Sequence, residues 1–335
     1  MLLAKNVVGN QPDWAQFITI ADGHKTPLLN MIPVGDKPVN ILKNYQADAY
    51  TEPTPVAWPD GKDWDTFESA AKNRGELKAR AQETVKTASV SRKAQDITDA
   101  AGVADELARE IKKKLVETSR TIEATMCCDQ EAYEDDGITG DKSRAVGKWI
   151  QNTAQALYPV PANLLTPAAS IYSGTKANLN EDAVNLLLES IWQTTGQSDD
   201  TRVLLCGSLL KKRFKDFQLY IPTSTVTQST ARVTTRQQGD DTIGSSIDYY
   251  DSEFGKLELH LTKWNAHANF GGSATKQQWR GYIMNLQMWS LHWNQKPLVH
   301  RLEFKGGSYN AAINTIWMLL CRNPICEGKI DPSDA

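Results

Sequence analysis

Hydrophobic residues between Asp99 and Asp136 recur at intervals of three and four, with charged residues at most of the positions between them. Such a repeat places apolar side chains on one face of an amphipathic helix. The apolar stripe consists of Val103, Leu107, Ile111, Leu115, Ile122 and Met126. About thirty helical residues would span roughly 45 Å, well beyond the average globular helix. The pattern therefore predicts a long strut helix whose stripe packs on the subunit's own sheet.

Two strand-like segments precede the predicted strut. Residues Asn40 to Tyr50 and Ala79 to Ile97 both carry β-branched residues and alternating polar positions. Between them, Pro59 to Gly61 reads Pro-Asp-Gly, and proline and glycine suit the backbone angles of a tight turn. We therefore predict that 79–97 returns antiparallel to 40–50, so that the chain between them projects as a long two-stranded loop.

The first forty residues show little periodicity. Pro12, Pro27, Pro33 and Pro38 favour an extended backbone. An extended segment of this kind cannot form a core of its own. The residues alone leave two interpretations open, an arm laid across neighbouring subunits or a mobile tail.

Downstream of the strut, helical and strand patterns alternate. Asn180 is a predicted N-cap for a helix that ends near Gly196, followed by a strand at Arg202 to Cys206 and a helix over 209–217. The first of these helices should bury Val184, Leu187, Leu188 and Ile191. This alternation indicates an α/β subdomain.

The last third of the chain shows mainly β patterns. Leu257, Leu259 and Leu261 alternate with polar residues, which predicts a strand with one buried face. Ile313 to Cys321 is apolar at both alternating positions, as in a fully buried strand or a short core helix. Trp289 and Trp293 fit core packing near these strands.

Composition limits the class of protein. With 335 residues, 40% of them hydrophobic, the chain can bury a sizeable core and hold two or three subdomains. A formal net charge of −3 argues against nucleic-acid binding by bulk attraction, so any contact with DNA should be local and weak. The basic cluster 211–215 fits the solvated face of a helix. No run is long enough to span a bilayer, and no signal peptide begins the chain, which predicts cytosolic synthesis.

The search for reactive groups predicts no enzyme, no catalytic residue, no cofactor and no metal. Five cysteines, an odd number, fit reduced thiols, and no two histidines have zinc-ligand spacing on a helix. The acidic residues 60–68 miss the EF-hand order and fit a solvated turn, and 137–147 miss the phosphate-loop spacing. Paired carboxylates at Asp135-Asp136 and Asp240-Asp241 keep a metal-dependent nuclease as an alternative.

Four phrases occur in a recognisable order along the chain. They are TPLLNMIP at 26–33, DAAGVADELA at 99–108, RGYIMNL at 280–286 and LLCRNPICEGKI at 319–330. Together with the order of arm, two-stranded loop, strut and mixed remainder, they resemble the major capsid (major head) proteins of tailed bacteriophages. These proteins have the Hong Kong 97-type fold. The resemblance covers nearly the whole chain, and it favours a strand at Ile313 to Cys321.

The resemblance implies an α+β fold with four parts. Residues 1–40 would be an N-terminal arm and 41–97 an extended loop. Residues 98–175 and 286–335 would form a peripheral domain built on the spine helix, and 176–285 an axial domain. The family-like phrases begin within the first thirty residues, so we expect an uncleaved subunit and any scaffold to be a separate protein.

The resemblance also implies a function. Identical chains would close into hexamers and pentamers that form an icosahedral or prolate head around double-stranded DNA, assembled in the host cytoplasm. Portal and decoration proteins would be further partners. The extended loop would lie over the adjacent subunit, with Trp58, Trp64 and Arg74 as contact candidates, because tryptophan is enriched at interfaces. Alternatively, both tryptophans fold back on their own domain, or the chain is a tail-tube or head-decoration protein.

Overall fold

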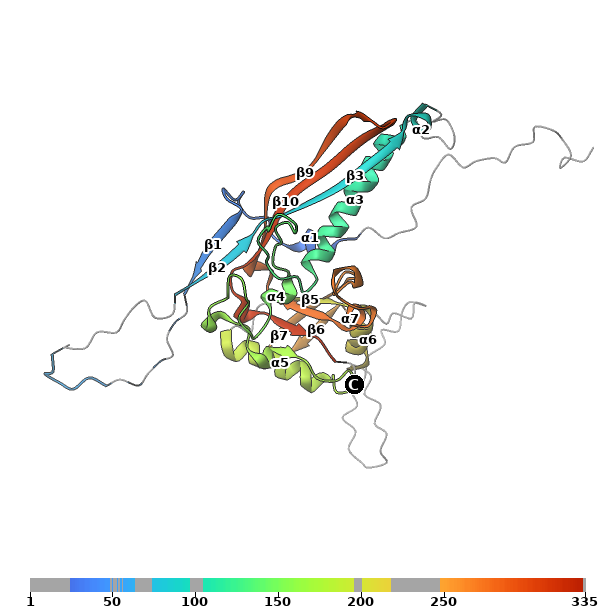
Figure 1. The fold of residues 1–335 in the computed structure, drawn as a ribbon. Coiled ribbons are helices and arrows are strands. Elements are labelled where there is room, and N and C mark those ends of the chain that lie inside the picture. The colour runs from blue at the N-terminus through green and yellow to red at the C-terminus, as the bar shows by residue number, and fades with distance from the viewer. Residues whose placement is uncertain are drawn as a thin grey trace, which may run out of the picture. The chain divides into compact units, whose positions relative to one another are not determined.

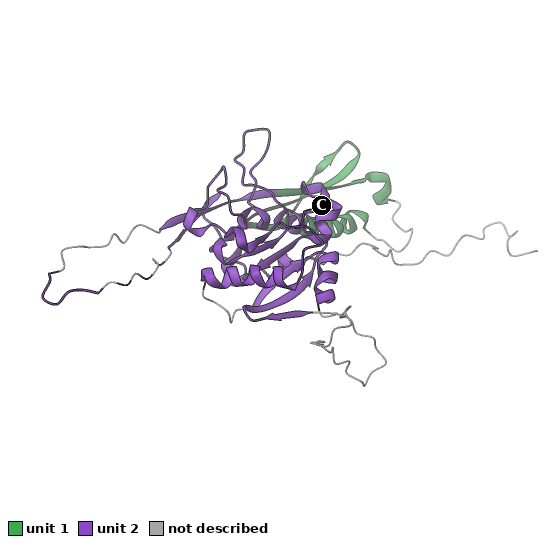
Figure 2. Cartoon of the chain, turned by 90° about the horizontal axis from the view of Figure 1, so that it is seen from below, with its two compact units in different colours: residues 1–25, 84–120, 295–315 green, residues 26–83, 121–294, 316–335 purple. Residues whose placement is uncertain are grey.

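The computed structural model describes residues 25–48, 50, 53, 55, 57–63, 74–96, 105–195, 201–217 and 248–333. The chain divides into two compact units, coloured separately in Figure 2. Unit 1 takes residues 1–25, 84–120 and 295–315, and unit 2 takes 26–83, 121–294 and 316–335. Several long elements continue from one unit into the other.

Unit 1 contains a three-stranded sheet with strand order β3-β10-β9 (Figure 1). These strands are β3 (Gln82–Ser91), β9 (Trp289–Lys305) and β10 (Ser308–Cys321), and two helices accompany them, α2 (Arg92–Asp96) and α3 (Glu106–Met126). Gly306 and Gly307, with φ of 65° and 76°, form the turn between β9 and β10. Positive φ at both central residues matches the twist of a two-residue hairpin.

The apolar stripe of α3 packs on the sheet of its own unit. Leu107 and Ile111 are buried in one cluster with the strand residues Ala88, Val90, Ala311 and Ile313, and Leu115 packs against this cluster half-buried. At the start of the helix, the Asp105 carboxylate accepts a hydrogen bond of 2.9 Å from the Ala108 amide, which makes it the N-cap. The predicted packing is thus confirmed for this part of the stripe; Val103 lies outside the described residues.

The helix is shorter than predicted at its C-terminal end. It ends at Met126 instead of continuing toward Asp136, and at about 1.5 Å per residue its 21 residues span roughly 31 Å. Past Met126 the apolar spacing stops, and aspartates compete for the backbone amides: the Asp135 carboxylate accepts from the Gly137 amide at 2.7 Å. Cys127 and Cys128 therefore follow the helix and do not lie within it.

Truncation of Ile111 to alanine should lower the free energy of unfolding by about 2–5 kcal/mol, because it leaves a cavity between α3 and its sheet. Lys112→Ala is the matched control on the exposed side of the same helix and should cost less than roughly 0.5 kcal/mol. Thermal unfolding of unassembled subunits measures both. An unchanged midpoint for Ile111→Ala would mean that the stripe serves a partner and not the subunit's own sheet.

Unit 2 is built on a six-stranded mixed sheet with strand order β4-β11-β8-β5-β7-β6. The strands are β4 (Ile171–Tyr172), β5 (Thr201–Cys206), β6 (Tyr249–Ser252), β7 (Gly255–Leu261), β8 (Gly281–Met284) and β11 (Gly328–Ile330). The central strand β5 runs parallel to β7 and antiparallel to β8. Its alternate residues face two separate cores, Val203 and Leu205 in one and Leu204 and Cys206 in the other.

Helices and short turns complete unit 2. The helices are α4 (Val146–Trp149), α5 (Glu181–Thr195), α6 (Ser208–Phe217) and α7 (Ala274–Trp279). The 3₁₀ turns are η3 (Ala162–Leu164), η4 (Ala168–Ser170), η5 (Ala268–Phe270), η6 (Leu286–Met288) and η7 (Pro324–Cys326). None of the helices in the described parts of the chain is long and apolar enough to cross a bilayer.

Most sequence predictions for this unit are confirmed. The Asn180 side chain caps α5 by accepting from the Ala183 amide at 2.9 Å, and the four predicted apolar positions of α5 are buried. The predicted strand at 202–206 and the helix after it are β5 and α6. The predicted burial of Leu261 is wrong, since its side chain is 56% exposed. Leu261 is the last residue of β7, and only Leu257 and Leu259 reach the core.

The two-stranded ribbon has a different return strand from the one predicted. β1 (Leu42–Ala47) pairs antiparallel with β2 (Gly75–Arg80), from Leu42 opposite Arg80 to Ala47 opposite Gly75 (Figure 1). Most of 79–97 instead forms β3 and α2, because the chain changes sheets at the buried Ala81. Leu77 and Ala79 of β2 are buried in the larger core of unit 2, which supports a ribbon that would be marginal alone.

The chain before the ribbon is not uniformly extended. Pro27–Met31 form a short helix, α1, with Pro27 in the first turn, where its missing amide hydrogen costs nothing. Leu28 and Ile32 are buried in the larger core of unit 2. The prediction of an extended backbone is therefore wrong for this stretch, although Pro12 and the other residues before 25 lie outside the described part.

Candidate assembly surfaces

The described part of the loop between β1 and β2 contains the predicted Pro-Asp-Gly turn. The Lys62 amide donates to the Pro59 carbonyl at 3.4 Å, and Gly61 has a φ of 75°, which few other residues adopt readily. Trp58 is 42% exposed; its indole N–H donates to the Lys62 carbonyl at 2.9 Å, and the Lys62 ammonium lies 5.4 Å from its ring. The turn thus orders one tryptophan and leaves part of its ring accessible.

The other two contact candidates differ in their position. Arg74 stands at the base of the loop, where its guanidinium lies 3.6 Å from the Asp48 carboxylate and both side chains are largely exposed. Trp64 lies outside the described residues. No contact joins Trp58 to Arg74 among the described residues, and the contact of all three candidates with a neighbouring subunit stays a prediction.

A buried carboxylate of α3 anchors α1. Glu123 is fully buried, and its two oxygens accept hydrogen bonds from the Leu28 amide at 2.9 Å and the Leu29 amide at 2.7 Å. Burial raises the pKa of Glu123 to about 7, although the two amides oppose this shift. The carboxylate satisfies amides that the first turn of a helix leaves unpaired, so it fixes the point where the N-terminal residues join the body.

Stability should fall between about pH 4.5 and pH 7 because of Glu123. Its folded pKa lies above the unfolded value of 4.5, so the folded chain binds the proton more tightly and loses this advantage as pH rises through about 7. At about 1.4 kcal/mol per pKa unit, the loss is at most about 3.5 kcal/mol.

Glu123→Gln should flatten this part of the pH profile of the unfolding free energy, measured by urea titration. Burial raises the pKa of Glu327 to about 8, so Glu327→Gln is the matched variant that should remove the remaining slope up to about pH 8. Parallel profiles for wild type and Glu123→Gln would contradict the assignment.

A network of charges around the buried Arg280 joins the chain after α3 to the C-terminal strand. Arg280 is 1% exposed and forms ion pairs with Asp129 and Asp331. The Lys329 ammonium lies 3.1 Å from Asp129. Cations around Asp129 hold the pKa of its carboxyl below the usual range, against the opposing effect of burial. Sequence inspection missed this network, because its members lie up to two hundred residues apart.

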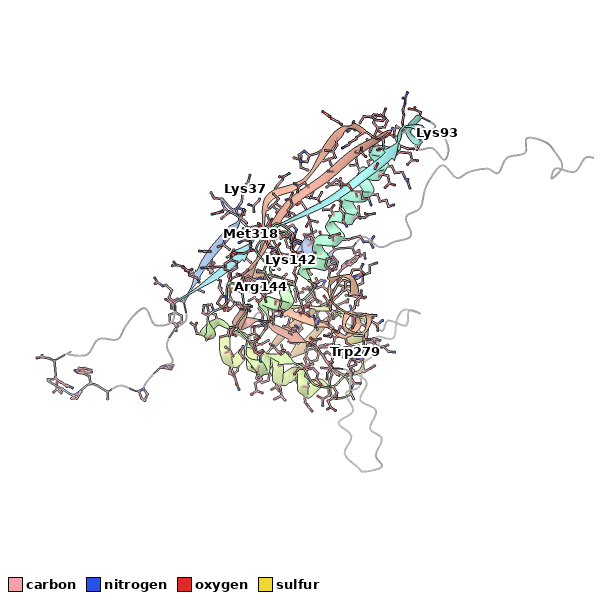
Figure 3. The ribbon with its side chains drawn as sticks, viewed as in Figure 1. Lys37, Lys93, Lys142, Arg144, Trp279 and Met318 are labelled. Carbon is pink, nitrogen blue, oxygen red and sulfur yellow. The ribbon has the colours of Figure 1, made fainter. Side chains whose placement is uncertain are left out.

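A groove of about 810 Å³ opens beside this network within unit 2. It is lined largely by residues 128–134, by Lys142 and by residues 269–271. Lys142 and Arg144, both labelled in Figure 3, come from the strand-like segment opposite Tyr133. Arg144 is 1% exposed and pairs at 2.9 Å with Glu131 of the groove lining, so this carboxylate is neutralised by a buried cation.

The described residues include few groups that could bind a metal ion or act as a nucleophile. No group of three or more metal-ligating side chains occurs among them. All five cysteines are buried free thiols, and burial raises the pKa of Cys128 to about 11 and of Cys206 to about 12, so neither is a thiolate at neutral pH. Asp240 and Asp241 lie outside the described residues.

Comparison with known proteins gives one family and many structural neighbours. The family model described as SU10 major capsid protein matches residues 3–332. The capsid of cyanophage P-SCSP1u has a TM-score of 0.63 at 8% identity, covering 99% of this chain and 97% of that one. A chain of Mycobacterium phage Cain has a TM-score of 0.58 at 12% identity, covering 100% and 99%. No curated protein matches significantly.

The fold is therefore the α+β Hong Kong 97-type fold of phage capsid proteins. The chain belongs to the SU10 major capsid protein family. It is a structural protein of the virion that forms the head shell. This assignment favours the capsid interpretation over the tail-tube, decoration and nuclease alternatives.

Proposed function

We propose that the chain assembles into hexameric and pentameric capsomers, which tile a closed head around double-stranded DNA. The observation that carries this proposal is the match to the major capsid family along almost the entire chain. In such a shell each subunit makes heterologous contacts, in which different patches of two identical chains meet. Assembly in the host cytoplasm, with separate scaffold, portal and decoration proteins, belongs to the same proposal.

In such a shell, four parts of the chain have different roles. Residues 1–40 act as the arm, 41–97 as the extended loop, 98–175 with 286–335 as the peripheral domain, and 176–285 as the axial domain. The contact candidates Trp58, Trp64 and Arg74 would meet the adjacent subunit. Contact with DNA is weak and non-specific, consistent with the net charge of −3.

Electron microscopy of the purified protein tests this function directly. We expect closed shells, or rings of five and six subunits, after concentration or addition of a scaffold. Sedimentation of the same sample reports the fraction of chain in particles. A protein that remains a monomer under all these conditions would contradict the proposal.

A further inference from the structure

The C-terminal part of β9 has an unusual surface for an edge strand. Leu298, Leu302 and Phe304 lie on one face of the strand, with His300 between the two leucines, and are 49%, 53% and 52% exposed. Among the described strands of this sheet, β9 pairs only with β10, and the bridge between Val34 and Leu291 on its other edge lies outside residues 295–305. Exposed apolar side chains of this size in a row indicate a surface that is covered in the assembled protein.

The chemistry of this strand limits what can cover it. The face of Leu298, Leu302 and Phe304 carries the cation Lys296 and no carboxylate, whereas Arg301, Glu303 and Lys305 alternate to the opposite face. Lys296 and Pro297 disfavour the addition of another strand to the edge, because proline lacks the amide hydrogen and like charges repel. A partner should therefore meet this face with an apolar group that has carboxylates beside it, one of which can approach Lys296.

Residues 133–142 of the same chain present this complementary chemistry. Ile138 is 95% exposed, and the loop contains Glu134, Asp135, Asp136 and Asp141 against Lys142. Tyr133 and Lys142 exchange two backbone hydrogen bonds, of 3.2 and 3.0 Å, at its base. We call residues 133–142 the acidic loop.

The acidic loop is held in shape before any partner arrives. The Asp136 carboxylate accepts from the Ile138 amide at 2.9 Å, the Thr139 amide at 2.6 Å and the Tyr133 hydroxyl at 2.6 Å. At the other side, the Asp141 carboxylate accepts from Arg80 at 2.7 Å. Preorganisation reduces the entropy lost on binding, so an exposed isoleucine on such a loop is a favourable contact.

We propose that the acidic loop of one subunit docks on the exposed face of β9, residues 295–305, of a second subunit, with Ile138 among Leu298, Leu302 and Phe304. The pairing rests on the proposed shell assembly, in which each chain supplies both halves of a heterologous contact. Opposite net charges on the two surfaces favour this arrangement over two β9 strands facing each other, because like charges would then meet.

Cysteine cross-linking tests the contact in assembled particles. The five native cysteines are buried, so wild-type particles should remain uncross-linked under mild oxidation. Ile138→Cys combined with Leu298→Cys, Leu302→Cys or Phe304→Cys should give covalent multimers on non-reducing gels in at least one pair. Leu186→Cys, 64% exposed on α5, combined with the same three positions is the matched control and should give none.

Two results of the cross-linking experiment would overturn the proposed contact. Cross-linking by Leu302→Cys alone would indicate that two β9 strands face each other and would overturn the proposal. Intact particles of all three pairs without multimers would also overturn it. If the wild-type chain forms no particles in the microscope, the proposed shell function itself fails, which is a different result.

The apolar and the charged contributions of the acidic loop can be separated by measuring the assembly rates of two variants. Ile138→Ser should slow assembly roughly tenfold, the effect of losing one modest hot spot. Asp135→Asn keeps the oxygen that accepts from Gly137 but removes the charge, so it should make assembly less sensitive to salt. Wild-type rates and salt dependence in both variants would refute docking by this loop.

Discussion

Deletion of residues 56–74 should abolish stable shells and leave a folded, soluble subunit. The base of the ribbon is held by Leu77 and Ala79, which are buried in the core of unit 2, and the deletion touches neither. Residues 48–55 remain to connect Ala47 with Gly75. The exposed pair of Arg74 and Asp48 is lost, at a cost below about 1 kcal/mol. Assembly fails because the proposed contact with the adjacent subunit is gone.

Electron microscopy of particles and thermal unfolding of unassembled subunits measure the two halves of this prediction. A second variant replaces residues 56–74 with a glycine–serine segment of equal length and separates chain length from side-chain contacts. Trp58→Ala tests the ordered turn alone, since hot spots at interfaces are enriched in tryptophan. Normal particles from the deletion variant would refute the assignment of the loop.

Replacement of Arg280 by methionine should lower the unfolding free energy of the subunit by about 3 kcal/mol, because it removes a buried cation from two partly buried carboxylates, Asp129 and Asp331. Asp129 retains Lys329 at 3.1 Å, whereas Asp331 retains only a contact of 4.0 Å with the same lysine. The loss should be smaller at acid pH, because removal of Arg280 lets the pKa of Asp129 rise and a protonated carboxyl needs no cation.

Arg74→Met is the matched control for Arg280→Met, since it makes the same substitution in an ion pair of the same unit that is largely exposed. Its effect on unassembled subunits should stay below about 1 kcal/mol. Urea denaturation at pH 7 compares the two variants. Equal effects would show that burial of the Arg280 network adds nothing to stability.

The sequence pattern was sufficient to predict those helices and turns whose signals lie within a few residues of one another. The N-cap at Asn180, the apolar spacing of α5 and the helical stripe of α3 follow from residues within one or two turns of each other. The Pro-Asp-Gly turn near Trp58 is equally local. The order of four short phrases extended this reading to a capsid family, which the family match confirms.

Pairing partners and helix ends depended on contacts distant in sequence. Residues 75–80 pair with β1 although 82–91 carries more β-branched residues, because Leu77 and Ala79 are buried in the core and β3 joins another sheet. The helical form of Pro27–Met31 depends on Glu123, about ninety-five residues away, which accepts from its amides. No local window contains both partners.

The sequence by itself therefore determined the class of protein, the main helices and the local turns, because periodicity and capping act over a few residues. Only the tertiary structure decided which strands pair, where α3 stops, and how Arg280, Asp129, Lys329 and Asp331 meet. It also decided that Ile138 and the apolar row of β9 are exposed. Burial and charge pairing are properties of the folded chain, since they arise when distant segments exclude water from one another.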